Sequence, residues 1–389
     1  MRVLISAYAC EPDRGSEPGV GWTWALAAAR DHDVCVLTRA NNRAPIEAAL
    51  AALSGPQPTF VYVDLPRWAR SWKRGGRGLR MYYALWQVAA AIAARRLHRE
   101  RQFDVVHHLT FANVWLPALA CLVRAPFVLG PVGGGPRVPL RLYPTLGPRG
   151  VLHEVWLVAG RMLSRGNPLV RLGWRRAAVV LVQNEETRRA LPGRLRAKAV
   201  LRPNPCVLPV ARVRRVPEAP LAVVAGRLLP WKGVALALGA IQLLPEWRLV
   251  VVGQGPDRGR LERLARRWGV DRRVRFVPWL AQEELWDAIA ASTALVVPSL
   301  REDASFVAAE AQSLGVPVVA FDRGGPAALA RAPKSRFLLV PLRSRAEAAR
   351  ALAAALLAAP DGVAPPVDFG PARVAADLGE VYDSAGAAA

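Results

Sequence analysis

The chain has 389 residues, which is enough for two or three domains, and 52% of them are hydrophobic. This content supports large buried cores and excludes an intrinsically disordered chain. The 53 Lys and Arg residues exceed the 30 Asp and Glu residues and give a formal net charge of +23. Such an excess favours polyanionic partners, namely nucleic acid, anionic lipid or a phosphorylated substrate, and charge alone does not choose among them.

Short-range patterns argue against a membrane span, a signal peptide and a metal site. The longest apolar runs, ALWQVAAAIAA and ALAAALLAA, are shorter than the roughly 18 residues that a spanning helix needs. The N-terminal MRVLISAYACEPDRG meets acidic and turn residues at once, so we expect a first strand there and not a signal peptide. The histidines form no metal-binding pattern. The scattered cysteines are typical of small buried residues in a reducing compartment: Cys10, Cys35, Cys121 and Cys206.

Both halves of the chain alternate strand-like and helix-like runs, which predicts parallel sheets covered by helices. In the first half, strands are expected at residues 3–8, 34–38, 59–65, 104–109, 126–130, 178–183 and 199–203, with helices such as 22–30 and 43–53 between them. In the second half, strands are expected at 221–226, 248–255, 273–279, 294–299, 316–321 and 336–341.

A proline-rich stretch lies between the halves and is typical of a hinge: Pro203, Pro205, Pro209, Pro217 and Pro220. We therefore predict an α/β protein with two doubly wound, Rossmann-like domains facing a central cleft. The expected boundaries are 1–208 for the first domain and 209–370 for the second. A helical tail at 371–389 is free to pack back on the first domain.

A glycine-rich loop follows the first strand, where DRGSEPGVGW contains Gly15, Gly19 and Gly21. Glycines let a backbone approach a phosphate closely, and the N-terminus of the following helix attracts it. The spacing differs from the dinucleotide fingerprint GxGxxG, and no acidic ribose partner is apparent on the second strand. The loop is thus a candidate phosphate contact facing the cleft.

Residues 66–101 and 137–176 combine arginines with aromatic side chains. One interpretation is that this half of the protein lies on an anionic membrane surface, with the aromatic rings at the headgroup level. The alternative is that the rings belong to the core and the arginines are solvated. We favour the core for the helical face within 79–97, and membrane or acceptor contact for the glycine-broken basic loop at 67–80.

Two histidines, His107 and His108, end the fourth strand of the first half. A neutral imidazole at the carboxyl end of a parallel strand can accept a proton or bind a sugar hydroxyl. Since adjacent strand residues point to opposite faces, we expect at most one of them to face the substrate. A structural role is the alternative for both.

The second domain opens with AGRLLPWKG, in which Arg227 and Lys232 follow the first strand of that domain. Two cations at a strand's carboxyl end, with Gly233 beside a helix start, would hold a diphosphate from one side. The next strand ends in Gly253, a further candidate for close approach to the ligand.

The stretch ALVVPSLREDASFVAAEAQSLGVPVVAF, residues 294–321, predicts a strand, a polar loop, a helix and a strand. The loop carries Glu302, and the helix that begins near Phe306 carries Glu310. Two carboxylates beside a predicted phosphate site are candidate acceptors for sugar hydroxyls. The alternative is a solvated loop charge at Glu302 and a helix-start acid at Glu310, which the helix dipole favours.

These motifs together resemble the retaining glycosyltransferases of family 4, also called glycosyl transferases group 1, which have the GT-B fold. The sharpest similarity lies in GRLLPWKG, VVGQGPDRGRLERL, FVPWLAQEELWDAIAASTALVVPS, the Glu302 to Glu310 pair and GVPVVAFDRGGP, in the same order as in that family. The first half is similar through the glycine loop, DVVHHLTF and GPVGGG.

The resemblance implies a role for each of these candidates. It implies that Arg227 and Lys232 bind the donor diphosphate, that Glu302 contacts the transferred sugar and that Glu310 contacts the nucleotide ribose. His107, or else His108, would be the histidine near the transferred sugar. The glycine loop at residues 15–21 would close over the phosphates.

The sequence departs from the family pattern in three places, and the first of them bears on donor choice. The Gly-Phe-Gly-like turn that commonly follows the first glutamate is replaced here by a loop in which Ser305 and Phe306 are the candidate donor contacts. The common Asn-Gly at the domain junction is Asn204-Pro205. The acid often found after the last Gly-Gly-Pro is replaced by alanines at 327–328.

The resemblance implies a metal-independent glycosyltransferase without a cofactor, whose donor substrate is a UDP- or GDP-linked sugar. The basic and aromatic segments lie in the acceptor-side half, which favours a lipid-linked or polysaccharide acceptor at the inner face of the cytoplasmic membrane and a role in envelope or exopolysaccharide assembly. The alternatives are a GT-B nucleotide-sugar epimerase and a catalytically silent glycosyltransferase-like scaffold. A nucleic-acid partner is not expected, because no nucleic-acid-binding module is recognisable.

Overall fold

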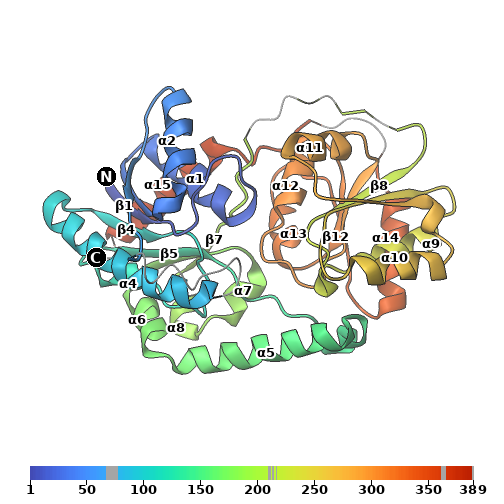
Figure 1. Cartoon of the computed structure of the whole chain (residues 1–389), viewed down its shortest axis with the longest axis horizontal. Coiled ribbons are helices and arrows are strands. Elements are labelled where there is room, and N and C mark those ends of the chain that lie inside the picture. The colour runs from blue at the N-terminus through green and yellow to red at the C-terminus, as the bar shows by residue number, and fades with distance from the viewer. Residues whose placement is uncertain (67–77, 209–211, 213, 216, 361–364, 388–389) are drawn as a thin grey trace. The chain divides into compact units, whose positions relative to one another are not determined.

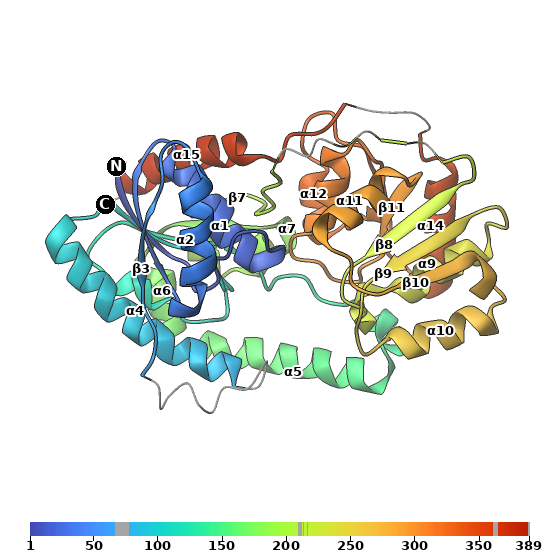
Figure 2. The same ribbon diagram turned by 45° about the horizontal axis from the view of Figure 1, so that its top comes forward.

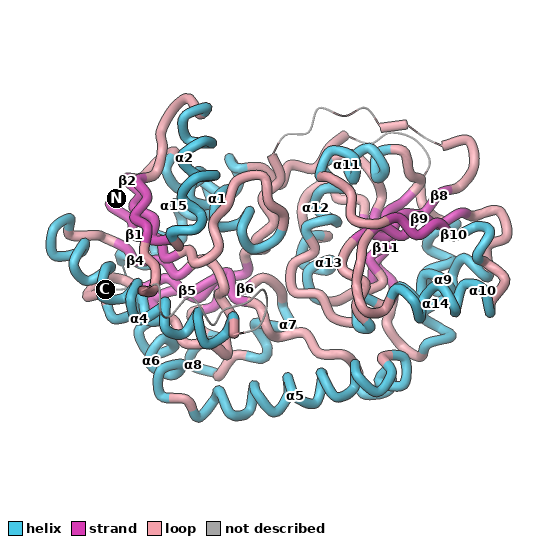
Figure 3. The backbone as a smooth tube through the Cα atoms, in the orientation of Figure 1, coloured by secondary structure: helices cyan, strands magenta, loops and turns pink. Residues whose placement is uncertain are grey.

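The computed structural model describes residues 1–66, 78–208, 212, 214–215, 217–360 and 365–387. Most of the basic loop predicted at 67–80, and Pro209 of the predicted hinge, lie outside these residues. Within them the strands form two parallel sheets, one of seven strands and one of six (Figure 1). Figure 3 shows the two groups of strands in magenta.

The first sheet has the order β3-β2-β1-β4-β5-β6-β7. Its strands are β1 (Arg2–Ser6), β2 (Asp33–Thr38), β3 (Thr59–Tyr62), β4 (Val105–His108), β5 (Phe127–Val132), β6 (Ala177–Val182) and β7 (Ala199–Leu201). The helices with it are α1 (Ser16–Ala29), α2 (Arg43–Ala52), α4 (Leu79–Arg101), α6 (Pro168–Arg176), α7 (Glu185–Ala190), α8 (Gly193–Arg196) and α15 (Pro371–Ala387), with short 3₁₀ turns η1 (Ala40–Asn42) and η2 (Leu119–Leu122).

The second sheet has the order β10-β9-β8-β11-β12-β13. Its strands are β8 (Leu221–Ala225), β9 (Arg248–Val252), β10 (Val274–Val277), β11 (Ala294–Val297), β12 (Val318–Phe321) and β13 (Phe337–Val340). The helices with it are α9 (Val234–Gln242), α10 (Arg258–Arg267), α11 (Gln282–Ala290), α12 (Phe306–Ser313), α13 (Gly324–Leu329) and α14 (Arg345–Leu357), with 3₁₀ turns η3 (Leu140–Thr145), η4 (Pro230–Lys232) and η5 (Asp271–Arg273).

The predicted strands are confirmed in both halves, because each expected run overlaps a strand and the strands of both described sheets pair in parallel. Short runs rich in Val, Ile and Leu suit a sheet that is covered on both faces. In the second sheet, alternate residues of β8 point to opposite cores: Ala222 and Val224 pack with α9, α10 and α14, whereas Val223 packs with α11 and α12. Figure 1 shows these two groups of helices on opposite sides of the sheet.

The chain divides into two compact units. Unit 1 comprises Met1–Gly135, Gly160–Cys206 and Gly370–Ala389, and unit 2 comprises Pro136–Ala159 and Val207–Phe369. The predicted first domain, 1–208, therefore needs a correction, because residues 136–159 pack with unit 2. The division falls within the long helix α5 (Gly147–Gly166).

The C-terminal helix α15 belongs to unit 1, where it packs along α1 (Figure 2). Arg202, which follows β7, forms ion pairs with Asp377 at 2.8 Å and Glu380 at 2.7 Å. These contacts hold the last helix against the residues that follow the last strand of the sheet.

The aromatic residues of helix α4 are predicted to lie either in the core or on a membrane surface. Tyr82, Tyr83, Trp86 and Ala90 are buried in a cluster with Tyr8, so the aromatic face of this helix belongs to the core. No helix among the described residues is both long and apolar enough to span a bilayer.

Candidate active site

Lys232 and Glu302 lie at the carboxyl ends of neighbouring strands in unit 2. Lys232 ends η4, which follows β8, and Glu302 lies in the loop after β11. Because β8 pairs with β11, the two loops meet, and the Lys232 Nζ lies 2.6 Å from the Glu302 Oε2. The Ser299 hydroxyl donates to the same carboxylate oxygen at 2.8 Å. The two predicted residues, 70 positions apart, thus form one charged pair whose side chains are 30% and 15% exposed.

The position of this pair within the sheet is where open α/β sheets bind ligands. Strand β8 has β9 on one side and β11 on the other, so the chain's winding reverses between β8 and β11. At such a switch point the connecting loops leave in opposite directions and open a crevice at the strands' carboxyl ends. Lys232 and Glu302 flank this point, one from each side.

Close backbone packing shapes these loops. Gly233 has φ 67°, and a Cβ atom there would lie 1.9 Å from the carbonyl oxygen of Pro298. Gly253 has φ 139°, and a Cβ atom there would lie 2.0 Å from the carbonyl oxygen of Gly226. Only glycine fits at either position, because both the backbone conformation and the space exclude a side chain. Gly253 therefore has a structural role, because it packs against the loop after β8. Its contact with a ligand stays a prediction.

The remaining predicted diphosphate contact, Arg227, forms no hydrogen bond or ion pair with either member of the pair. Its side chain is exposed, and within the described ranges its guanidinium has no hydrogen-bond or ion-pair partner. An unengaged arginine near the carboxyl end of β8 keeps its five donors available for an anion. Its role as a diphosphate ligand stays a prediction.

Glu310 lies in the second turn of α12 and is partly buried. Its Oε1 accepts a hydrogen bond of 3.0 Å from the side-chain amide of Gln282, the first residue of α11. Burial raises the pKa of Glu310 to about 7, although the bond from Gln282 opposes the shift. Sequence reasoning missed Gln282, because nothing in its local pattern says which helix end faces α12.

We expect this carboxyl group to make unit 2 less stable as the pH rises. The group titrates at 4.5 ordinarily and at about 7 in the folded protein, so the folded state holds the proton more tightly. Stability from this group is therefore complete below pH 4.5 and is lost as the pH rises through 7. Glu310→Gln should remove about 2–3 kcal/mol of this pH dependence.

Urea unfolding at pH 5 and pH 8 measures the effect. The control is Glu246→Gln, at an exposed carboxylate of the same unit, which should behave as wild type. An equal pH dependence in wild type and Glu310→Gln would show that the carboxylate is solvated in the folded state.

Ser305 precedes α12 in a conformation that disfavours its side chain. Its φ is 85°, in the left-handed region, and it is only 4% exposed. Its hydroxyl is buried and has no hydrogen-bond partner within the described ranges. The Ser305-Phe306 loop, a departure from the Gly-Phe-Gly-like turn, thus carries backbone strain where a glycine would carry none.

Ser305→Gly should therefore raise the free energy of unfolding of unit 2 by about 0.5–1 kcal/mol, the left-handed penalty less glycine's entropy cost. The matched control is Ser344→Gly, at another helix start. Ser344 has φ −78° and its hydroxyl accepts a hydrogen bond from the Glu347 N–H, so the same change should be destabilising there. Chemical unfolding of both variants measures these changes. A loss of stability in Ser305→Gly would show that the backbone at Ser305 is not strained.

In unit 1, the glycine loop is shorter than predicted. Gly15 caps the N-terminus of α1 in extended conformation, but Gly19 and Gly21 lie inside that helix. The absence of a side chain at Gly21 lets α1 approach the segment that follows β1, since a Cβ atom would lie 2.1 Å from the Ala9 carbonyl oxygen. Among the three glycines, only Gly15 precedes the helix; their contact with phosphate stays a prediction.

The two predicted catalytic histidines lie inside unit 1, 0% and 1% exposed, where the sequence predicts that at most one of them faces the substrate. His107 lies 2.9 Å from the Tyr382 hydroxyl through Nδ1 and 2.6 Å from the Gly130 carbonyl oxygen through Nε2. Burial lowers its pKa to about 4. With both nitrogens bonded, His107 ties α15 to β4 and β5, and its catalytic role stays a prediction.

His108 points to the other face, where its Nε2 lies 3.1 Å from the Tyr83 hydroxyl. Burial, followed by the neighbouring His107, lowers its pKa to about 3. Both imidazoles are therefore neutral at pH 7, as expected from the sequence. Ser6 of β1 pairs with His108, so these histidines also lie where the winding of the first sheet reverses.

Comparisons with known proteins bear on the half of the chain that carries the Lys232–Glu302 pair. Residues 211–361 match the family described as Glycosyl transferases group 1. This segment is a group 1 glycosyltransferase domain. The D-inositol 3-phosphate glycosyltransferase of Streptomyces bingchenggensis is 38% identical over 155 residues, which cover 36% of this chain and 34% of that protein. The matches thus span about a third of the length of such relatives.

Solved structures extend the similarity in fold to the whole chain. Sucrose-phosphate synthase from Thermosynechococcus elongatus has a TM-score of 0.61 at 17% identity and covers 100% of both chains. The Anabaena protein HepE in complex with UDP and glucose has a TM-score of 0.57 at 17% identity and covers 98% of this chain and 99% of its own. The fold is GT-B, with two Rossmann-like domains.

The group 1 domain is supported by a segment that lies outside the family match. In unit 2, Glu154 of α5 is 3% exposed and lies 2.7 Å from the Nε of Arg301. The Arg301 guanidinium lies 4.4 Å from the Trp231 ring centroid, and His153 stacks on the same ring at 4.6 Å. Because Trp231 precedes Lys232 and Arg301 precedes Glu302, the segment 136–159 helps to hold both loops of the charged pair. Sequence reasoning missed these contacts.

Proposed function

We propose that this protein is a retaining, metal-independent glycosyltransferase that moves a sugar from a UDP- or GDP-linked donor to a lipid-linked or polysaccharide acceptor. The observation that carries the proposal is the Lys232–Glu302 pair at the switch point of the group 1 domain. HepE, which shares the fold, was solved with UDP and with UDP-glucose. The D-inositol 3-phosphate glycosyltransferase of Streptomyces bingchenggensis is similar in sequence to this domain.

The chemistry follows from the charges at this point of the sheet. Departure of the nucleoside diphosphate develops negative charge on phosphate and positive charge on the sugar ring. Lys232 would stabilise the first charge as the donor's diphosphate displaces Glu302 from its Nζ. Glu302, held by Ser299, would then accept hydrogen bonds from the sugar hydroxyls and favour the positive ring.

Glu310 would bind the nucleotide ribose through hydrogen bonds that its carboxylate accepts. The half-charged state expected near pH 7 is compatible with this, since ribose hydroxyls can replace the Gln282 amide as donors. The proposed acceptor would be met at the inner face of the cytoplasmic membrane, in envelope or exopolysaccharide assembly, where the net charge of +23 favours anionic lipid.

The test is nucleotide release from UDP-, GDP- and ADP-sugars, with and without a membrane lipid extract. Release from one donor that rises with the extract, and an α-linked product from an α-linked donor, would establish retaining transfer. Activity that persists in a chelator would support metal independence. Absence of release and of nucleotide binding for every donor would overturn the proposal.

A further inference from the structure

Helix α5 buries charged side chains and exposes apolar ones. The face that is buried carries two charged residues, Glu154 at 3% exposure and Arg161 at 8%. The opposite face carries large exposed apolar side chains in two groups about two turns apart: Leu152 69%, Val155 53% and Trp156 61%, then Met162 64% and Leu163 78%. A surface helix in water ordinarily has the reverse arrangement.

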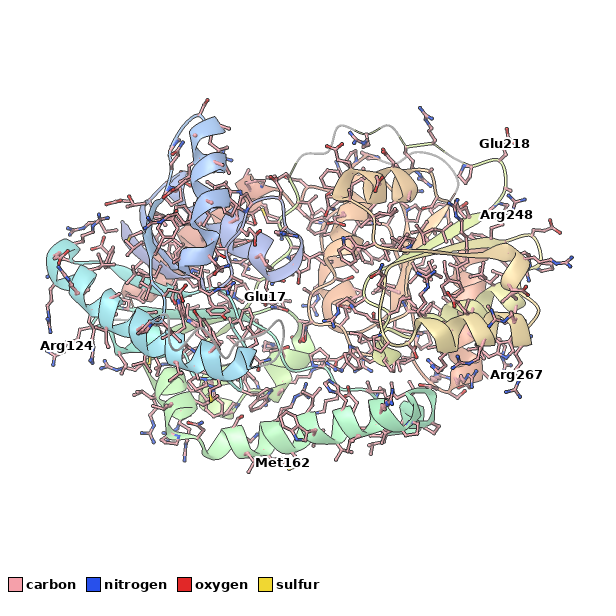
Figure 4. All side chains as sticks on the ribbon, in the orientation of Figure 1. Glu17, Arg124, Met162, Glu218, Arg248 and Arg267 are labelled. Carbon is pink, nitrogen blue, oxygen red and sulfur yellow. The ribbon has the colours of Figure 1, made fainter. Side chains whose placement is uncertain are left out.

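This exposed apolar stripe runs for about 17 Å along the helix, at roughly 1.5 Å per residue from 152 to 163. Met162 projects from α5 into open space (Figure 4). No charged residue interrupts the exposed face between Arg149, which is exposed, and Arg165, whose guanidinium lies 5.3 Å from the Trp115 ring centroid. The following helix α6 adds three exposed arginines, Arg171, Arg175 and Arg176.

An apolar stripe that is flanked by the exposed arginines of α6 and by Arg149 matches the boundary of an anionic bilayer. Apolar side chains enter the acyl region there, tryptophan favours the headgroup level, and arginine binds lipid phosphate while its stem covers apolar surface. A second copy of the chain is a poorer partner, because each copy carries a net charge of +23.

We propose that α5 is a membrane-docking helix that lies in the interface of an anionic bilayer through this apolar stripe. The inference deepens the proposed function, which places the acceptor at a membrane, and names the element that would bring the protein there. It assigns a use to the exposed side chains of Leu152, Trp156 and Leu163.

Flotation with phosphatidylcholine vesicles, with and without phosphatidylglycerol, tests the proposal on the full chain. The variant combines Leu152→Gln, Trp156→Gln and Leu163→Gln, since glutamine preserves helix propensity. The matched control combines Leu357→Gln, Trp279→Gln and Leu243→Gln, which remove two leucines and one tryptophan exposed at 68%, 67% and 51% outside α5.

Wild type and the control should bind the phosphatidylglycerol vesicles and bind neutral vesicles weakly, while the α5 variant should lose at least about tenfold in affinity. Equal binding by the α5 variant, equal loss in the control, or no binding by wild type would overturn the proposal. So would a lipid-free wild-type dimer that the α5 variant converts to a monomer, because the stripe would then cover a second copy.

UDP binding by calorimetry on the same samples tests the proposed function separately. Both triple variants should bind UDP as wild type does, because none of the changed residues lies at the Lys232–Glu302 pair. Vesicle binding without UDP binding would support the docking helix and count against the transferase. UDP binding without vesicle binding would support the transferase and count against the docking helix.

Discussion

Lys232→Ala should lower the rate of nucleotide release at limiting donor by about 10²–10³-fold, the loss typical of removing one preorganised charge at a developing anion. The Lys232 Nζ is the cation placed at the switch point of the sheet, 2.6 Å from the Glu302 carboxylate. Without it, the diphosphate would meet an unpaired carboxylate and be repelled. The affinity for UDP should therefore fall together with the rate.

Lys334→Ala is the control, because this lysine is exposed in the same unit. It should leave both quantities unchanged. Thermal unfolding separates lost function from lost folding, and the ion pair is exposed enough that its removal should cost no more than about 1 kcal/mol. A Lys232→Ala protein that is folded and still binds UDP as wild type does would remove Lys232 from the diphosphate site.

Glu302→Gln should separate binding from turnover. The neutral amide can still accept the Ser299 hydroxyl, but it no longer holds the Lys232 ammonium by charge. Lys232 is then available to the diphosphate, so the affinity for UDP should stay constant or rise by about a few fold. The rate at saturating donor should fall by about 10²–10³-fold, because the charge that favours the positive sugar ring is lost.

A comparison of UDP affinity and saturating rate in Lys232→Ala and Glu302→Gln gives the decisive result. We expect opposite or unequal effects on UDP affinity and a common loss of rate. Glu262→Gln is the control, since it also removes the glutamate of an ion pair in unit 2, here between Arg258 and Glu262, whose side chains are each 34% exposed. A parallel loss of UDP affinity in both test variants would show that the ion pair only holds the two loops in their conformation.

The apolar periodicity of the sequence predicts the strands well, because a buried parallel strand is visible as a short continuous run of apolar residues. Residues 248–255 and 294–299, for example, contain β9 and β11. The motifs also place Lys232 and Glu302 after neighbouring strands. Their 2.6 Å contact and the third partner, Ser299, depend on strand order, which comes from pairing between distant segments.

Burial is the property that local patterns predict least. His107 and His108 lie at the carboxyl end of a central strand, where open α/β sheets usually bind ligands, yet both side chains are buried. The cover comes from Tyr382 on the last helix and Tyr83 on α4, 275 and 25 residues away in the chain. The pKa of each histidine follows from this burial, so its protonation follows from the tertiary structure.

The sequence by itself determined the two α/β halves, the strand positions and the chemistry of the group 1 motifs, because each of these is written in short runs of residues. Only the tertiary structure decided that residues 136–159 pack with unit 2, that Ser305 is strained, and that α5 turns its apolar side outward. These features depend on which surfaces meet, and hydrophobic burial is non-directional, so a helix pattern shows that a face is apolar but not what covers it.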